Sequence, residues 1–407
     1  MENQLLPHLF RTEYHKIVTV LSAHFGFAHT SLGEDIASDT FLTAAETWGQ
    51  KGLPANPVAW LYHVAKNKAR DHLKHVRVTQ KAAAALRQPE ELLPDIDLSE
   101  QNIRDSQLRM MFAICQPVIS PAAQTGLALR ILCGFGIDEI ADAFLSNKET
   151  INKRLFRARE TLRKRQVEIA VPAESQLGER LPAVLATLYL LFNEGYYSSH
   201  KDLTVRKDLC LEAIRLAYLL IQNEGTNRPE VNALLALMCY HASRFEARID
   251  EQGEMIRYDD QDRGLWNDEL IARGHHFLHA ASSGDKITKY HLEATMAYWH
   301  TQKTDPPEKW ENILQLYNRL LQLEYSPVAA LNRTYALAKA RGKEAAIAEA
   351  VKLPLLSNHL YHVLMGYLYR ETQPDKAQCH LQKALQLART TAERNRIRKD
   401  LAESSSR

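Results

Sequence analysis

The stretch IDEIADAFLSNKETINKRLFRARETLRKR, residues 137–165, indicates the fold most directly. Its opening segment, IDEIADAF, places its apolar side chains on one side of a short helix. A short break follows. Ser146 and Glu149 then have the spacing of a capping box, so we expect a second helix to begin there.

The second helix of this stretch has an apolar side and a strongly basic side. The residues expected to face inward are Ile151, Leu155, Ala158 and Leu162. The basic residues expected to face outward are Lys148, Lys153, Arg154, Arg157, Arg159, Arg163, Lys164 and Arg165. Two short helices joined by a tight turn, with the second capped and basic, form the helix-turn-helix pattern, whose second helix enters the major groove of DNA. An ordinary helical hairpin with a solvated basic surface remains the alternative.

Basic side chains also recur along an earlier helix, PVAWLYHVAKNKARDHLKHVRV (57–78). Pro57 suits a first helical turn. The apolar residues that predict a buried stripe are Val58, Leu61, Val64, Ala65, Ala69 and Leu73. The basic residues Lys66, Arg70, Lys74 and Arg77 recur on another face, a pattern typical of a solvated helix or of a face that follows DNA phosphates. The presence of two such helices in one chain favours the second interpretation.

The composition is that of a globular helical protein. Hydrophobic residues make up 45% of the 407 residues and charged residues 25%, with only 16 Gly and 15 Pro. The net charge of +2 is too small to indicate nucleic-acid binding, so any such signal must be local. The five scattered cysteines predict reduced, mostly buried thiols in the cytoplasm. No apolar run reaches the roughly 20 residues of a membrane span, and the N-terminus lacks the pattern of a secretory signal.

Breaks in the helical pattern divide the chain. The breaks are QPEELLPDIDLSE (88–100), which is rich in acids, and VPAESQLGE (171–179). We therefore expect helical segments at 8–82, 103–168 and 178–404, with a flexible acidic linker at 83–102.

These segments resemble a known family. Residues 34–75 contain an acidic-aromatic helix, the turn GLPANPVAWL and the sequence AKNKARDHLK, and they resemble region 2 of extracytoplasmic-function sigma factors of the sigma-70 family. Residues 108–165 resemble region 4 of the same family. LPAVLATLYLLFNEGYYSS (181–199) resembles the segment after region 4 in members that carry a tetratricopeptide-like C-terminal domain. The resemblance covers nearly the whole chain.

The resemblance implies an all-α protein with two small helical domains, region 2 at 8–82 and region 4 at 103–168. The linker joins them, and a tetratricopeptide-like helical domain at 178–404 follows. The implied function is that of a cytoplasmic sigma factor, which binds core RNA polymerase through the β′ clamp helices and the β flap and directs it to promoter DNA. Because the polymerase does the chemistry, we expect no catalytic residue, cofactor, metal or membrane contact in this chain.

The resemblance also implies roles for individual positions. The residues implied to contact core polymerase are Asp35, Asp39, Thr40, Phe41 and Ala44. Those implied to contact the −10 element are Trp60, Lys66, Asn67, Lys68, Arg70, Asp71 and Lys74. Those implied to contact the −35 element are Lys148, Thr150, Asn152, Lys153, Arg154 and Arg157. Lys66 stands where the family often has Arg, and Lys74-His75 stands where two arginines are common. Since Lys does not reproduce the bidentate contacts of Arg, the base preference there stays open.

The C-terminal half contains one recognisable repeat. YHVLMGYLYRETQPDKAQCHLQKALQLA (361–388) resembles a tetratricopeptide repeat, with Gly366 and Tyr369 at the small and aromatic positions of its first helix. The residues that fit the second helix, if the turn is one residue shorter than the repeat's norm, are Ala377, Leu381 and Ala384. Stacked helix pairs commonly bind a peptide or partner helix on their concave face. We therefore expect such a partner here, and a role in regulating the sigma module.

Two features could indicate an active site, but a structural explanation is simpler for each. Glu194 in FNEGY (192–196) has no evident titratable partner and is expected at a helix end. Histidines cluster at two places, which are His72 with His75, and His275 with His276 and His279. These histidines lack Asp, Glu or Cys at the matched spacing of a metal site.

Another class of protein would also explain the helix-turn-helix pattern. In a one-component transcriptional regulator, a helical repeat domain would sense a ligand or peptide, and the helix-turn-helix would bind an operator as a dimer. That interpretation predicts tight DNA binding by the protein alone. A sigma factor without polymerase binds duplex DNA weakly and with strong salt dependence. The match to region 2 favours the sigma factor.

Overall fold

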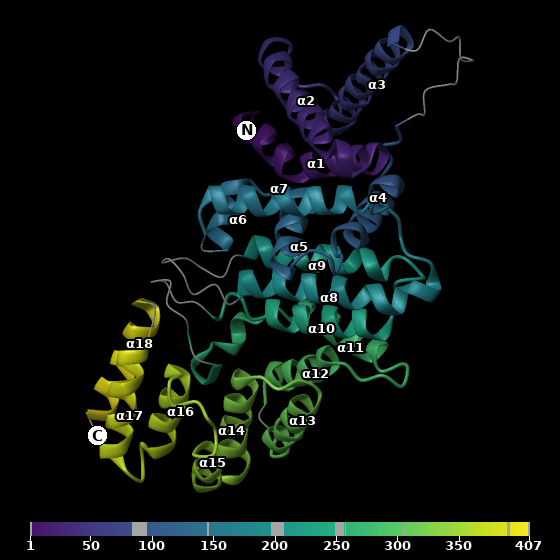
Figure 1. Ribbon diagram of the computed structural model, residues 1–407. Coiled ribbons are helices and arrows are strands. Elements are labelled where there is room, and N and C mark those ends of the chain that lie inside the picture. Colours follow the sequence, from purple (N-terminus) through teal and green to yellow (C-terminus); the bar gives the residue numbers. More distant parts are fainter. Residues whose placement is uncertain are drawn as a thin grey trace. The chain divides into compact units, whose positions relative to one another are not determined.

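The computed structural model is built of helices. It describes residues 2–83, 96–144, 146–196, 207–248, 256, 258–304, 306–388 and 391–405. Within these residues there are 18 α-helices and no strand, so the all-α prediction is confirmed (Figure 1). The chain divides into two compact units, residues 1–191 and 192–407, and the division falls within helix α8 (Glu174–Tyr196).

The first unit begins with three long helices and continues with shorter ones. Its elements are α1 (Glu2–Phe25), η1 (Phe27–His29), α2 (Thr30–Lys51), α3 (Pro57–Ala83), α4 (Glu100–Ile114), α5 (Pro121–Leu127), the π-helical turn η2 (Ala128–Leu132), α6 (Ile137–Ala143), α7 (Lys148–Lys164) and the first part of α8. Helix α3 extends beyond the predicted 57–78. Of the predicted linker at 83–102, residues 84–95 lie outside the described residues, and α4 begins inside its end. The predicted domain boundaries stay predictions.

Short polar side chains determine where helices of this unit begin. Ser99 precedes α4 in an extended conformation, and its hydroxyl accepts a hydrogen bond from the Asn102 amide at 3.3 Å. Ser120 caps α5 in the same way, accepting from the Ala123 amide at 3.4 Å. Pro121 occupies the first turn of α5, where no amide donor is needed.

Helix α1 holds the first unit together. It packs against α2, α3, α4 and η2. Its residues Ile17 and Leu21 are fully buried. The buried Thr19 hydroxyl donates to the His15 carbonyl at 2.7 Å and also lies 3.1 Å from the Ile131 carbonyl of η2. The helices predicted for region 2 and those predicted for region 4 are therefore packed in one unit.

The first part of α8 also belongs to this unit. The helix begins inside the stretch 171–179 that the sequence predicts as a break, so the break is shorter than expected. The Arg180 guanidinium donates to the Phe112 carbonyl of α4 at 2.6 Å. The Thr187 hydroxyl donates to Gln124 Oε1 of α5 at 2.9 Å. Hydrogen bonds thus join α8 to α4 and α5.

In the second unit each α-helix packs against the next one along the chain. Beyond the end of α8, the elements are α9 (Lys207–Ile221), α10 (Pro229–Ala242), η3 (Tyr258–Asp260), η4 (Arg263–Leu265), α11 (Asp268–Ala281), α12 (Lys289–Thr301), α13 (Lys309–Leu323), α14 (Pro327–Arg341), α15 (Lys343–Ala350), α16 (His359–Tyr369), α17 (Pro374–Leu387) and α18 (Thr391–Ser405). Such helices bury their apolar faces mainly on their neighbours.

The pair α16 and α17 explains why a small residue is needed at one position. A Cβ on Gly366 would lie 2.7 Å from Leu381 Cγ of the facing helix. Ala377 and Ala384 are fully buried on either side of Leu381. The two helices predicted in 361–388 are confirmed, while their tetratricopeptide character stays a prediction.

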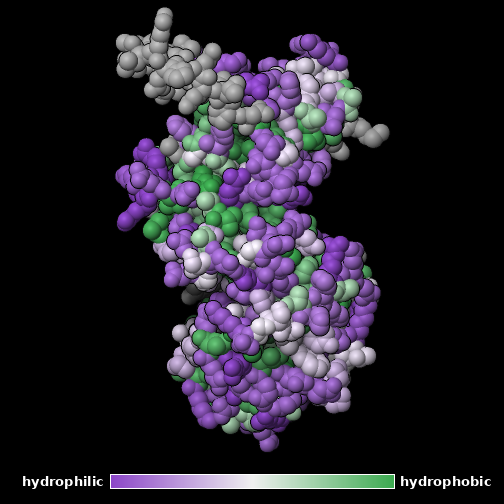
Figure 2. Space-filling view, turned by 90° about the vertical axis from the view of Figure 1, so that its right-hand side faces the viewer, coloured by the Kyte–Doolittle hydropathy of each residue, from purple (hydrophilic) through white to green (hydrophobic). Residues whose placement is uncertain are grey.

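Hydrophilic residues cover most of the face shown in Figure 2, with apolar residues in small groups. Within the described ranges, no helix combines the length and the apolar character needed to cross a lipid bilayer. Four cysteines are buried and Cys379 is exposed, as the scattered thiols predict. Burial raises the pKa of the Cys115 thiol to about 12, so that thiol is unreactive at neutral pH.

Gly366→Ala should destabilise the chain even though Ala favours helices over Gly. The added methyl group overlaps Leu381, and overpacking of this kind costs about 1–3 kcal/mol. The measurement is the urea midpoint of unfolding followed by circular dichroism. Gly178→Ala is the matched control, because a Cβ on Gly178 of α8 meets nothing within 4 Å. It should be neutral or stabilising by up to about 1 kcal/mol. Equal midpoints for the two variants would contradict the close packing.

Candidate nucleic-acid interface

Helix α7 begins one residue later than the sequence predicts. Asn147 has the extended backbone of a cap (φ −99°, ψ 157°), and its side-chain oxygen accepts from the Thr150 amide at 2.8 Å. The Ser146 amide instead donates to the Ala141 carbonyl at 2.9 Å, just beyond the end of α6. The predicted capping box of Ser146 and Glu149 is therefore wrong. The predicted short helix, tight turn and second helix are confirmed.

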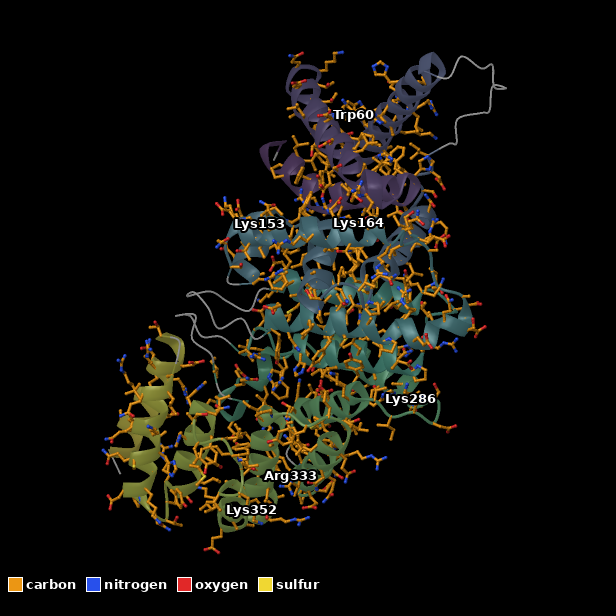
Figure 3. The ribbon with its side chains drawn as sticks, in the orientation of Figure 1. Trp60, Lys153, Lys164, Lys286, Arg333 and Lys352 are labelled. Atoms are coloured by element: carbon orange, nitrogen blue, oxygen red, sulfur yellow. The ribbon has the colours of Figure 1, made fainter. Side chains whose placement is uncertain are left out.

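One side of α7 is buried and the other carries residues predicted to contact DNA. The inward-facing residues are buried as predicted, and they are Ile151, Leu155, Ala158 and Leu162. The exposed candidates are Lys148, Thr150, Asn152, Lys153 and Arg157. Arg154 is half-buried, with its guanidinium 5.5 Å from the centre of the Phe144 ring. An ion pair of 2.6 Å between Lys148 Nζ and Asp138 Oδ1 ties the start of α7 to α6. Lys153 lies in the first half of the helix and Lys164 at its end (Figure 3).

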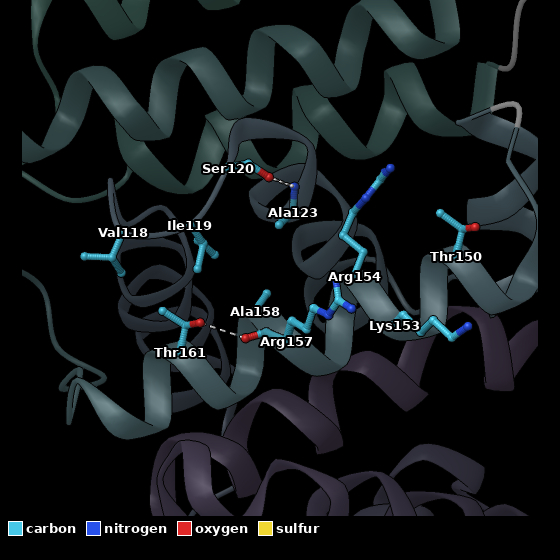
Figure 4. A pocket seen from close by; sticks show the side chains of 10 residues that line it. All are labelled: Val118, Ile119, Ser120, Ala123, Thr150, Lys153, Arg154, Arg157, Ala158 and Thr161. Atoms are coloured by element: carbon cyan, nitrogen blue, oxygen red, sulfur yellow. Dashed lines mark hydrogen bonds between the residues drawn. The ribbon is translucent and has the colours of Figure 1, made fainter.

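A cavity of about 420 Å³ lies between α7 and the start of α5 (Figure 4). Its apolar lining residues are Val118, Ile119, Ala123 and Ala158. Its polar lining residues carry hydroxyl or cationic groups, and they are Ser120, Thr150, Thr161, Lys153, Arg154 and Arg157. Hydroxyl groups and cations beside an apolar wall can hold an anionic group, such as a DNA phosphate, by charge-assisted hydrogen bonds.

Helix α3 also has a buried stripe and a more open face. Of the predicted stripe, Leu61, Ala65 and Ala69 are fully buried, whereas Val58, Val64 and Leu73 are half-buried. Of the residues predicted to contact DNA, Asp71 and Lys74 are exposed. The half-buried candidates are Trp60, Lys66, Asn67, Lys68 and Arg70. Trp60, labelled in Figure 3, lies on α3. Its ring packs edge-to-face on Trp48 of α2, with ring centres 5.3 Å apart.

Two of the five α2 residues predicted to contact polymerase are exposed to solvent. Asp35 and Asp39 are exposed, whereas Thr40, Phe41 and Ala44 are buried. The three buried residues take part in the packing of α2. Their side chains are therefore not open to a partner in this structure, because helical spacing places them on the core stripe. The carboxylates of Asp35 and Asp39 are left as the accessible groups.

A single carboxylate bonds α2 to η2 and α7. Glu34 Oε1 accepts hydrogen bonds from Arg130 Nε at 3.1 Å and from Arg159 Nη2 at 2.8 Å, and its Oε2 lies 3.3 Å from Arg159 Nη1. The Glu34 side chain is only 14% exposed. The outward orientation predicted for Arg159 is therefore wrong. Because removing one partner from a buried ion pair is costly, these bonds restrain α2 against α7.

Glu194 and the two histidine clusters were the features of the sequence that could have indicated an active site. Glu194 lies near the end of α8, as predicted, and burial raises the pKa of its carboxyl group. The histidines of both predicted clusters are exposed, namely His72, His75, His275, His276 and His279. Within the described part of the chain, no group of three His, Cys, Asp or Glu side chains could hold a metal ion.

Comparison with known proteins gives a family without an assigned function. Residues 180–282 match a family of unknown function, DUF6596. The chain is 33% identical over 388 residues to the uncharacterized protein R00370 of Rhizobium meliloti (strain 1021). That match covers 92% of this chain and 90% of the Rhizobium protein. No solved structure matches the chain.

Lys153→Glu should weaken the binding of the full chain to duplex DNA at low salt. If Lys153 neutralises one phosphate, the slope of log affinity against log salt should fall by about one. Fluorescence anisotropy across a salt series measures both quantities. Lys286→Glu makes the same charge change at an exposed lysine between α11 and α12 (Figure 3), and it should leave the slope unchanged. If both variants lost affinity equally, net charge rather than α7 would account for binding.

Proposed function

We propose that this chain, which belongs to the same family as the Rhizobium meliloti protein, is a sigma factor that directs core RNA polymerase to promoters. The observation that carries the proposal is the geometry of α7. This capped helix buries its apolar stripe and presents Lys153, Arg154 and Arg157 to an open cavity. A second basic helix, α3, lies in the same unit, and the sequence around both helices resembles extracytoplasmic-function sigma factors.

In this proposal α1 to α3 form region 2 and α4 to α7 form region 4. The α16–α17 pair is one tetratricopeptide-like repeat of a C-terminal domain that regulates the sigma module. The chain works in the cytoplasm, with the β′ clamp helices, the β flap and promoter DNA as its partners. It makes and breaks no covalent bond itself.

Charge and stacking would do the physical work of promoter opening. The cations of α7 neutralise phosphates at the −35 element and fix the position of the chain on the duplex. The polar and basic face of α3 holds the −10 strand, and aromatic stacking of an exposed base contributes about 1–3 kcal/mol. Trp60 is the aromatic residue of α3 that the resemblance assigns to this contact, although its packing on Trp48 leaves only part of the indole open.

The first unit has to open for α3 and α7 to reach separate DNA elements. The Glu34 bonds to Arg130 and Arg159 oppose that opening. Asp35 and Asp39, which would contact polymerase, lie on the same helix as Glu34. Polymerase binding to α2 would therefore act on the helix that the ion pairs restrain.

Reconstituted transcription tests the proposal. Asp39→Arg should weaken binding to core polymerase, because it reverses an exposed charge on α2 without disturbing the core. Lys153→Glu should retain polymerase binding but lose promoter-specific run-off transcription. Pull-down of core polymerase and run-off assays on genomic DNA measure the two effects. Tight dimeric binding of the chain alone to one operator, with no polymerase binding, would instead support a one-component regulator.

Glu34→Gln should increase promoter-directed transcription at limiting polymerase by several-fold. The change removes the negative charge that holds two guanidinium groups, so the closed arrangement loses about 1–3 kcal/mol. Hydrogen exchange of η2 and α7 should rise in the free protein. Glu46→Gln, at an exposed position of the same helix, is the control and should change neither quantity. Unchanged exchange in Glu34→Gln would show that the ion pairs do not maintain the closed unit.

A further inference from the structure

The cavity between α5 and α7 has the size of a small-molecule site. Its volume of about 420 Å³ lies within the roughly 300–1,000 Å³ that is usual for such sites. The α7 residues that line it recur at steps of three and four, so they share one face of the helix, and they are Thr150, Lys153, Arg154, Arg157, Ala158 and Thr161. This face runs about 16 Å along the helix. The cavity is therefore long enough for a molecule with two chemically different ends.

The two ends of the cavity differ in chemistry (Figure 4). Val118 and Ile119, from the segment before α5, lie at one end. Lys153 and Arg154 lie at the other end, and Arg157 lies between the two ends. One end is therefore apolar and the other cationic.

The apolar end can cover part of a bound molecule. Val118 is 46% exposed, and its side chain is open to a partner. Ile119, Ala123 and Ala158 are almost fully buried and continue the apolar wall of the cavity. Covering apolar surface lowers the free energy in proportion to the area removed from water. A DNA phosphate is polar and gains nothing from this wall, so the wall favours a ligand that also has an apolar part.

The three cations of the cavity are available to an anion. In the described part of the chain, the ion pairs of α7 involve Lys148, Arg159 and Arg163, and none of these residues lines the cavity. The guanidinium of Arg154 rests 5.5 Å from the centre of the Phe144 ring, which restrains it before any ligand arrives. A restrained donor loses less conformational freedom on binding.

The hydroxyl groups of the two ends also differ. Thr150, at the cationic end, bonds to Asn147 through its amide, and within the described ranges its hydroxyl forms no hydrogen bond. The Thr161 hydroxyl, at the apolar end, donates to the Arg157 carbonyl at 2.8 Å. Each hydroxyl has one hydrogen to donate. The cationic end therefore keeps a hydroxyl donor for an anion, and the apolar end does not.

We propose that this cavity binds a small amphipathic anion, which has a phosphate or carboxylate head and an apolar ring or chain. The head bonds to Lys153, Arg154 and the Thr150 hydroxyl by charge-assisted hydrogen bonds. The apolar part covers Val118 and Ile119. A bound molecule occupies cations that the proposed function assigns to DNA phosphates, and it therefore competes with duplex DNA for α7. Only this competition rests on the proposed function.

Calorimetry of the full chain tests the binding. The probe is naphthyl phosphate, and its two halves, inorganic phosphate and naphthol, are titrated separately at equal ionic strength. We expect saturable binding of naphthyl phosphate that is at least about tenfold tighter than that of either half, because each half engages one end of the cavity. Naphthoate, titrated in the same way, distinguishes a carboxylate head from a phosphate head.

Two variants and their matched controls locate the site. Lys153→Gln should weaken the binding of naphthyl phosphate about tenfold. Val118→Ser should weaken it about fivefold and leave the binding of inorganic phosphate unchanged, because only the apolar contact is lost. The controls are Lys164→Gln, at the exposed end of α7 (Figure 3), and Val351→Ser, at an exposed valine after α15. Both controls should bind as wild type.

Anisotropy of a labelled duplex tests the competition. Saturating naphthyl phosphate should lower the affinity of the chain for DNA, and inorganic phosphate at the same concentration should not. Binding of naphthyl phosphate without displacement of DNA would overturn the competition.

Two further results would overturn the site itself. One is the absence of saturable binding of both naphthyl phosphate and naphthoate. The other is equal affinity of the two variants and their controls, which would place the probe elsewhere. Run-off transcription separates this failure from that of the proposed function. If transcription succeeds and neither probe binds, only the ligand site is wrong, whereas binding at the cavity without promoter-directed transcription would refute the sigma factor and leave the site.

Discussion

A carboxylate held between two guanidinium groups sets the arrangement of the first unit. Glu34 lies on α2, while Arg130 and Arg159 lie 96 and 125 residues further along the chain. These side chains are largely shielded from water, so the Coulomb attraction between them is stronger than at an exposed surface. The same bonds tie α7 to α2, against which the other basic helix, α3, packs. Any function that needs α3 and α7 apart has to overcome this attraction.

Regular spacing made much of the helical architecture predictable. The buried stripes of α7 and α3 follow from steps of three and four residues, because each turn of a helix brings such residues to one side. The start of α7 was less predictable, since Ser146 and Asn147 are both good caps and only the end of α6 decides between them. The orientation of Arg159 could not be predicted, because its acidic partner is distant in sequence. The resemblance placed Thr40, Phe41 and Ala44 at a contact with polymerase, and it did not reveal that these side chains are buried in the core.

In the second unit, too, some contacts follow from the sequence pattern and others do not. The contact of Gly366 with Leu381 follows from the pattern of a helical repeat. The burial of Arg244, Arg248 and Lys309 does not, because a sequence pattern treats charged residues as solvated. The motif FNEGY drew attention to Glu194, yet Tyr196 is the residue that contacts His241 and Arg244. The burial of a cationic side chain becomes visible only when segments far apart in the chain are brought together.

Helix α8 limits where this protein can be cut. Its first part is hydrogen-bonded to α4 and α5, and the hydroxyl of its last residue, Tyr196, lies 3.5 Å from Arg244 Nη2 in the second unit. A fragment that stopped at the end of α7 would lose the donors that Arg180 and Thr187 supply. A fragment that began after α8 would lose Tyr196. Proteolysis or gene truncation at either place would therefore damage one unit, and an evolutionary exchange of the C-terminal half would have to carry α8 along or replace it.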